Sequence, residues 1–220
     1  MVDCHSHLLP GVDDGVQSME ESLQNLREME QQGIRRVWLT PHIMEDIPNE
    51  TLALQRKFRE LLQQYRGAVE LKLAAEYMLD NLFEERLEKE DLLLLEEGKR
   101  FLLVETSYFN PPMDFLSVLQ RIQKKGYYPL LAHPERYEYM QKEDYNTLKE
   151  EHISFQLNLP SLAGMYGKRV QGKAEWILRN GMYDRMGCDT HSCHRYQQML
   201  FSSIKHNQTK LLDGVNANTL

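Results

Sequence analysis

The chain has few cysteines, and their placement excludes two common roles. Cys4, Cys188 and Cys193 form an odd set that lacks the spacing of a zinc finger or of a redox motif. A framework of disulfide bonds is therefore not expected, and the thiols are expected to be reduced.

The chain also lacks long apolar runs, a secretory signal and an excess of basic residues. No run approaches the roughly 18 apolar residues that a membrane span needs. The start Met1-Val2-Asp3 has neither the basic nor the apolar region of a signal peptide, so we expect a cytoplasmic protein without membrane insertion. The formal net charge of −7 argues against nucleic acid as the main partner, because binding to a phosphate backbone needs Lys and Arg gathered in a patch. No residue pattern indicates the oligomeric state.

What the sequence does have is an alternation of apolar, strand-like runs with amphipathic helices. Residues 18–21 are typical of a helix capping box, and the helix that follows ends at Gly33. Its apolar stripe consists of Met19, Leu23, Leu26 and Met29. The pattern predicts a single α/β domain over residues 1–220, folded as a barrel of about seven strands with helices between them. The strands are expected at residues 1–5, 34–40, 68–75, 101–104, 128–132, 153–157 and 183–188.

Residues able to bind a divalent cation follow nearly every expected strand. His5 and His7 are two positions apart, so both rings can leave the end of the first strand on one face. Active sites of (β/α) barrels form at the carboxyl ends of the strands, where distant parts of the chain meet. We therefore expect one metal site built from His5, His7, Asp14, His42, Glu76, Glu105, His133, Asp189 and His191.

Each of these residues also has a structural interpretation. A Glu after a strand commonly caps the next helix, and a lone His is more often a hydrogen-bonded core or loop residue. Gly11 and Gly15 let either Asp13 or Asp14 turn inward, and the other would cap or brace the loop. Outside the expected metal site we interpret the following as turn, structural or solvated residues: Asn158, His152, His194 and His206.

The number of candidate ligands indicates more than one ion. Nine side chains exceed what one tetrahedral ion can use, so two or three divalent ions are expected. Four of the nine are carboxylates, so three dications would leave a surplus of about two positive charges, which suits a dianionic substrate. Mixed imidazole and carboxylate ligation suits Mn, Fe or Zn better than Ca or Mg. Closely spaced ions of this kind are typical of sites for in-line attack on phosphorus.

Six segments of the chain form one ordered series of motifs. The segments are Asp3-Cys4-His5-Ser6-His7 with residues 8–15, Thr40-Pro41-His42, Ala75-Glu76-Tyr77, Val104-Glu105-Thr106-Ser107, Ala132-His133-Pro134-Glu135-Arg136-Tyr137 and Asp189-Thr190-His191. Taken in order, they resemble the polymerase and histidinol phosphatase (PHP) superfamily. The similarity is greatest to its metal-dependent tyrosine-protein phosphatases of bacterial capsular and exopolysaccharide synthesis, and it covers nearly the whole chain. The resemblance implies a distorted TIM-like (β/α)7 barrel of PHP type, a trinuclear metal centre that is often assigned as Mn, and phosphotyrosine as substrate.

The resemblance also implies roles for individual residues. It selects Asp14 over Asp13 as the ligand, and it marks Arg136 as a residue that binds phosphate. A guanidinium three residues beyond a candidate ligand agrees with that role. The alternative is a surface arginine paired with Glu135 or Glu138.

The chain departs from the family pattern after His191, where the segment is shortened. Arg195 is the candidate for a displaced second arginine that binds phosphate.

The expected activity is hydrolysis of phosphotyrosine by a metal-activated hydroxide. The ions and Arg136 would stabilise charge on the phosphoryl oxygens. The expected partner is a phosphotyrosine protein, the tyrosine-rich tail of a bacterial kinase that governs polysaccharide export. Phosphatases that use a cysteine nucleophile need an Arg after five intervening residues, and none of the three cysteines has one. Two alternatives stay open: a phosphoesterase for small molecules such as histidinol phosphate or a nucleotide, and a scaffold that keeps metal only for stability.

Overall fold

The structure, a computed structural model, describes residues 1–96, 100–191, 212 and 214–215. Its strands are β1 (Val2–Ser6), β2 (Arg36–Leu39), β3 (His42–Ile43), β4 (Glu70–Leu73), β5 (Glu76–Met78), β6 (Leu95–Glu96), β7 (Arg100–Glu105), β8 (Tyr128–Ala132), β9 (Ser154–Asn158) and β10 (Arg185–Gly187). Its helices are α1 (Met19–Gln31), α2 (Thr51–Gln64), α3 (Asn81–Lys89), α4 (Phe115–Lys124), the short 3-10 helix η1 (Pro134–Arg136), α5 (Lys142–Glu150), α6 (Leu159–Leu162) and α7 (Gly167–Arg179).

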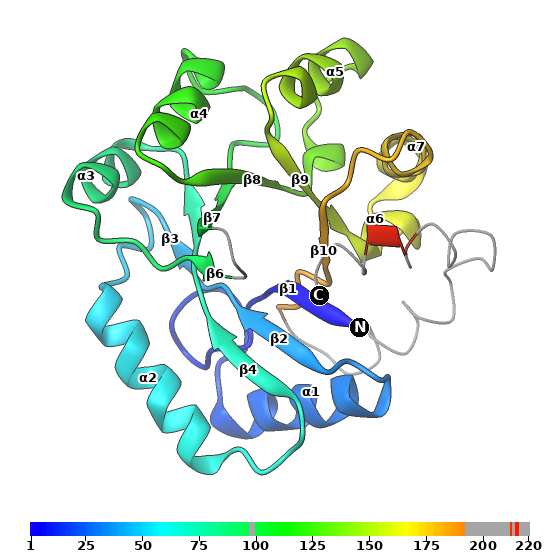
Figure 1. Cartoon of the computed structure of the whole chain (residues 1–220). Coiled ribbons are helices and arrows are strands. Elements are labelled where there is room, and N and C mark those ends of the chain that lie inside the picture. The colour runs from blue at the N-terminus through cyan, green and yellow to red at the C-terminus, as the bar shows by residue number, and fades with distance from the viewer. Residues whose placement is uncertain (97–99, 192–211, 213, 216–220) are drawn as a thin grey trace.

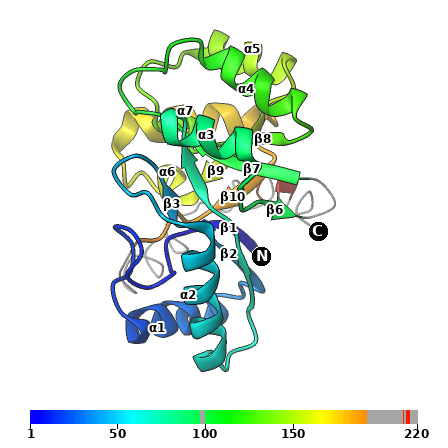
Figure 2. The same ribbon diagram turned by 90° about the vertical axis from the view of Figure 1, so that its left-hand side faces the viewer.

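The strands form two parallel sheets that together make a distorted barrel. One sheet has the order β1-β2-β4, and the other has the order β10-β9-β8-β7-β5-β3, with β6 antiparallel on β7. The sheets meet between β1 and β10, where Asp189 N donates to His5 O at 2.8 Å and His7 N donates to Thr190 O at 2.9 Å. Helices lie around the outside of the strands, with α1 and α2 on one side and α4 and α5 on the other (Figures 1 and 2). The predicted barrel is confirmed.

Two of the expected strands change sheets partway along. The chain leaves β2 at Leu39 and resumes as β3 at His42, and it leaves β4 at Leu73 and resumes as β5 at Glu76. If β2 with β3 and β4 with β5 are each counted as one strand, and the short antiparallel β6 is left out, the described residues form seven strands, as predicted. His42 and Glu76 are therefore the first residues of new strands, whereas the sequence predicted that they directly follow strands 34–40 and 68–75.

Local sequence explains where the first helix begins and ends. Ser18 Oγ accepts from Glu21 N at 3.2 Å, which is one half of the predicted capping box. The other half differs, because the Glu21 carboxylate accepts from Gln17 N. α1 ends at Gln31, and Gly33 adopts a φ of +79° that glycine tolerates without strain.

The core has two parts. The larger cluster joins helix residues such as Leu26 and Leu61 to strand residues, so it lies between the helices and the barrel wall. The smaller cluster contains no helix residue and includes Val2, Cys4 and Trp38. Cys4 and Cys188 are buried, whereas Cys193 lies outside the described residues. Within the described part of the chain, no helix has the length and apolar character needed to cross a bilayer.

Gly187 allows β10 to approach β1 closely, and its replacement should be destabilising. A Cβ at this position would lie 2.5 Å from His5 Cβ and 2.8 Å from His5 N. We predict that Gly187→Ala lowers the free energy of unfolding by about 1–3 kcal/mol, the usual range for overpacking. The matched control is Gly172→Ala on the exposed side of α7, where a Cβ meets nothing within 4 Å.

The control variant Gly172→Ala should raise the free energy of unfolding by about 0.5–1 kcal/mol, because alanine restricts the unfolded chain and favours the helix. Urea denaturation followed by circular dichroism measures both changes. Equal stability of Gly187→Ala and the wild type would contradict the close approach of the two strands.

Candidate metal centre

Seven of the nine candidate ligands line a pocket of about 520 Å³, and the other two, His5 and His7, lie buried beside them. All nine belong to overlapping groups whose potential ligand atoms lie within 4.8 Å of one another. His5 and His7 are completely buried, whereas Asp14 is exposed. The remaining pocket residues include Met44, Met78, Tyr108, Arg136 and Tyr166. The barrel therefore brings together every side chain for which the sequence predicted metal ligation.

His5 and His7 point nitrogen lone pairs at the same space. His5 Nδ1 lies 2.9 Å from Gln156 Oε1, and His7 Nδ1 lies 2.8 Å from Asp13 Oδ2. Both oxygens are acceptors, so each Nδ1 carries a proton, and each ring offers a lone pair on Nε2 once that nitrogen is deprotonated, as metal binding requires. The two Nε2 atoms lie 3.1 Å apart. Two lone pairs at that distance repel each other, and a shared cation removes the repulsion.

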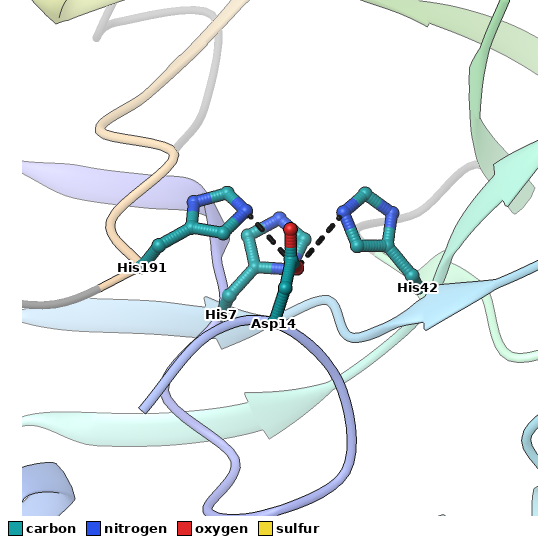
Figure 3. Close-up of side chains that lie close together, drawn as sticks. All are labelled: His7, Asp14, His42 and His191. Carbon is teal, nitrogen blue, oxygen red and sulfur yellow. Dashed lines mark ion pairs between the residues drawn. The ribbon is translucent and has the colours of Figure 1, made fainter. Parts of the chain in front are cut away.

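Asp14 and Asp13 take different positions in the first loop. Asp14 Oδ1 lies 3.5 Å from His42 Nε2 and 3.4 Å from His191 Nε2. Dashed lines in Figure 3 mark these two ion pairs. Asp13 instead accepts from His7 Nδ1, from Gly15 N and from His42 N. Asp14 therefore faces the candidate ions, while Asp13 braces the loop and orients His7.

The centre contains buried polar atoms that make no hydrogen bond. They include His42 Nδ1, Glu76 Oε2 and Glu105 Oε1. His42 Nδ1 nevertheless lies 3.2 Å from Glu76 Oε2 and 3.1 Å from Glu105 Oε1. Buried polar groups in folded proteins are nearly always satisfied, so orphan atoms that converge indicate a missing partner. A cation among them satisfies them together.

The imidazoles and carboxylates of the centre shift each other's pKa values toward the charged forms. Burial disfavours a charged ring at His5, but the carboxylates of Glu76 and Asp189 outweigh burial and raise the pKa of His5 to about 9. Burial would raise the pKa of Glu76 and that of Asp189, yet the imidazoles, His5 first, hold both well below the usual range. Both carboxylates are therefore ionised at neutral pH and available as ligands.

Two candidate ligands lie on a backbone conformation that residues other than glycine rarely adopt. His133, directly after β8, has a φ of 34°, and Asp189, just beyond β10, has a φ of 49°. The left-handed region costs about 1–2 kcal/mol for such residues. Backbone strain of this kind clusters at functional sites, where it aims a side chain.

The donor set fits divalent transition metals. Imidazole nitrogens and carboxylate oxygens suit Mn, Fe and Zn, and neither buried cysteine belongs to the groups that could hold an ion. His5, His7, His42 and Glu76 each belong to two of these groups, so neighbouring ions would share ligands. The residues present therefore fit a centre with more than one ion.

A second set of buried polar residues, which was not predicted from the sequence, orients the candidate ligands. Gln156 Oε1 accepts from both His5 Nδ1 and His133 N. Asn158, which we interpreted as a turn residue, donates to Asp189 Oδ2 at 3.0 Å, so that interpretation was incomplete. Glu135 accepts from Asn158 N and from the Tyr183 hydroxyl. Gln156 and Asn158 are two apart on β9, a spacing that could have indicated one inward face.

The arginine and histidine predictions have different outcomes. Arg136 Nη1 donates to Asp189 Oδ2 at 2.6 Å, and its side chain is 17% exposed. It is therefore not a surface arginine paired with Glu135 or Glu138. Arg195, His194 and His206 lie outside the described residues, whereas His152 is exposed, as expected for a solvated residue.

Comparison with known proteins agrees with this geometry. The capsular polysaccharide synthesis family CpsB/CapC matches residues 1–216 of the chain. The chain belongs to the CpsB/CapC family. Among its CpsB/CapC relatives, the tyrosine-protein phosphatase YwqE of Bacillus subtilis is 28% identical over 199 residues, which cover 87% of this chain and 78% of YwqE. The tyrosine-protein phosphatase CpsB of Streptococcus pneumoniae is 29% identical over 209 residues, which cover 87% of this chain and 83% of CpsB.

Solved structures give the same fold. A crystal structure from a study of YwqE and CpsB, described as unique metal-dependent tyrosine phosphatases, superposes with a TM-score of 0.80 at 22% identity. It covers 98% of this chain and 93% of that structure. The Escherichia coli phosphotriesterase homology protein has a TM-score of 0.56 at 11% identity, over 96% of this chain and 94% of that protein. The CpsB/CapC chain thus shares a TIM-type barrel with both.

Gln156 offers a test of the centre that leaves every candidate ligand in place. We predict that Gln156→Met, which keeps the volume but removes the acceptor of His5 Nδ1, weakens binding of Mn²⁺ by about 10- to 100-fold. Titration calorimetry on protein stripped of metal measures the affinity. Gln63→Met on the exposed face of α2 is the control and should bind like the wild type. Unchanged affinity in Gln156→Met would contradict the orienting role.

Proposed function

We propose that this chain is a metal-dependent phosphatase that hydrolyses phosphotyrosine in proteins. The observation that supports this most is the pocket itself, because seven of the nine candidate ligands and Arg136 line it, and the other two ligands, His5 and His7, lie within the same groups of ligand atoms. Relatives in the CpsB/CapC family are named tyrosine-protein phosphatases, which supports the same substrate class. The absence of an Arg after five intervening residues at any cysteine argues against a thiol nucleophile.

The proposed ligands of two or three Mn ions are His5, His7, Asp14, His42, Glu76, Glu105, His133, Asp189 and His191. Fe and Zn suit the same donors. When bound, divalent ions in such a site activate water and neutralise charge on phosphoryl oxygens. The four carboxylates would leave about two positive charges if three ions bind, which matches the charge of a phosphate monoester.

In this proposal Arg136 binds the phosphoryl group. Its guanidinium presents several N–H donors in one plane, and that geometry suits two phosphate oxygens at once. Nη1 already donates to Asp189, which fixes one end of the guanidinium beside the candidate ligands. The leaving group is a phenol with an unperturbed pKa near 10, so it departs more readily than an alkyl alcohol and needs little help from an acid.

The proposed physiological substrate is the tyrosine-rich tail of a bacterial tyrosine kinase that controls capsular or exopolysaccharide synthesis, and the proposed location is the cytoplasm. Membership in the CpsB/CapC family supports this pathway. Turnover of a phosphotyrosine peptide and of histidinol phosphate, compared with Mn²⁺ present, tests the substrate class. A higher kcat/KM for histidinol phosphate would reverse the assignment.

Chelation should remove activity almost completely. We predict that dialysis against EDTA abolishes turnover of a phosphotyrosine peptide and that added Mn²⁺ restores it, because the ions supply the activated water. Elemental analysis before and after dialysis should show more than one transition-metal ion per chain, then none. Full activity in protein shown to be free of metal would refute the proposed mechanism.

Substitutions at the pocket should separate binding of metal from binding of phosphate. We predict that His42→Ala and Arg136→Ala each lower kcat/KM by at least about 10²-fold, the usual effect of losing one stabilising group. Only His42→Ala should lower the metal content. Arg179→Ala at the exposed end of α7 is the control for loss of a guanidinium. If both pocket variants fold and keep wild-type activity, the assigned site is wrong.

A further inference from the structure

Two tyrosine rings lie against the guanidinium of Arg136. The Arg136 Cζ atom is 4.5 Å from the centroid of the Tyr108 ring and 4.3 Å from the centroid of the Tyr166 ring. Tyr108 lies in the loop after β7, Arg136 ends η1, and Tyr166 directly precedes α7. The three side chains come from different parts of the chain and line the same pocket. This contact has no part in the ligand set described above.

Asp189 is a poor sole anchor for this arginine. Its Oδ2 accepts from Arg136 Nη1 at 2.6 Å and also from Asn158 Nδ2 at 3.0 Å. Its Oδ1 lies 3.4 Å from His5 Nε2 and 3.3 Å from His7 Nε2, among the candidate ligands. A carboxylate that shares its charge with cations attracts a guanidinium less strongly. Arg136 therefore needs a second source of positioning that does not depend on that charge.

Aromatic rings can supply this positioning. A guanidinium near a ring is attracted by the negative face of the ring, and this contact covers the plane of the guanidinium while its edge stays free to donate hydrogen bonds. The contact contributes about 0.5–2 kcal/mol, depending on how well water is excluded. Arg136 is mostly buried at 17% exposure, so the attraction is only partly screened.

The Tyr108 ring is itself held in place, and the backbone before Tyr166 forms a turn. The Tyr108 carbonyl accepts from Glu138 N at 2.7 Å, which ties its loop to the segment just beyond η1. The Tyr108 ring also lies 5.7 Å from the His133 ring, centroid to centroid. Tyr166 follows a turn in which Met165 N donates to Pro160 O at 3.1 Å, and its ring is 37% exposed at the mouth of the pocket.

We propose that Tyr108 and Tyr166 form an aromatic clamp, a pair of positioning residues that holds Arg136 with its donor edge turned toward the bound phosphoryl group. The clamp fixes the guanidinium before substrate arrives, so binding of phosphate loses less side-chain entropy. This inference rests on the proposed function in one respect, because the proposed function gives Arg136 a phosphoryl group to bind.

The test compares the phosphate affinity of variants that lose each tyrosine ring with that of variants that keep a ring. Tyr108→Leu and Tyr166→Leu should weaken binding of inorganic phosphate to the metal-loaded protein by about 3- to 30-fold, the size of a cation–π contact. Tyr108→Phe and Tyr166→Phe keep the ring and should bind within about twofold of the wild type. Titration calorimetry measures the affinity, and elemental analysis should show unchanged metal content in all four variants. Tyr128→Leu, at the amino end of β8, is the control for loss of an exposed ring.

A double-mutant cycle separates positioning from general damage to the fold. In an Arg136→Ala background, Tyr166→Leu should have almost no further effect on phosphate affinity, because the residue that it positions is gone. An equal loss in both backgrounds, or a loss in the Phe variants as large as in the Leu variants, would overturn the clamp.

The proposed function can fail separately from the clamp. If the wild type binds inorganic phosphate but does not hydrolyse a phosphotyrosine peptide, the proposed function is wrong, and the ring variants still test the clamp through phosphate affinity. If the wild type hydrolyses the peptide and the Leu variants bind phosphate like the wild type, the clamp is wrong and the proposed function stands.

Discussion

The metal centre depends on a convergence of lone pairs in a space that water hardly reaches. The Nε2 atoms of His5 and His7 lie 3.1 Å apart, and they are 3.1 Å and 3.4 Å from Glu76 Oε2. Like charges and lone pairs at these distances repel strongly where the dielectric constant is low. Positive charge among these atoms, either a proton on an imidazole or a bound cation, stabilises the arrangement. The cluster is thus built to bind cations, and the hydrogen bonds to the Nδ1 atoms prevent the rings from turning away.

The barrel creates this convergence at the seam between its first and last strands. Asp189 N donates to His5 O across the seam, and the absence of a side chain at Gly187 lets the two backbones approach. On the far side, the shifts from β2 to β3 and from β4 to β5 bring His42 and Glu76 to the same pocket. Asp189 belongs to the candidate ligands and also accepts a hydrogen bond from Arg136, so this one carboxylate links the candidate metal centre to the arginine.

Much of the fold follows from local sequence. The apolar stripe of α1 predicts a helix that packs by Leu26 and Met29, and both are fully buried. Strand positions are correct because each is a short apolar run between helices, and the predicted bounds differ from the observed ones by a few residues. The sheet shifts at residues 40–41 and 74–75 could not be predicted, since they depend on which neighbouring strand supplies hydrogen bonds.

By itself, the sequence determined which residues can bind metal and that most of them follow strands, because ligand chemistry and strand periodicity are local properties. Only the tertiary structure decided how they are oriented. It separates Asp14, which faces the pocket, from Asp13, which accepts from His7, and it assigns Gln156 and Asn158 to the support of His5 and Asp189. Such hydrogen bonds join residues up to 151 positions apart, and no local pattern encodes a partner at that separation. Their geometry exists only once the barrel has closed.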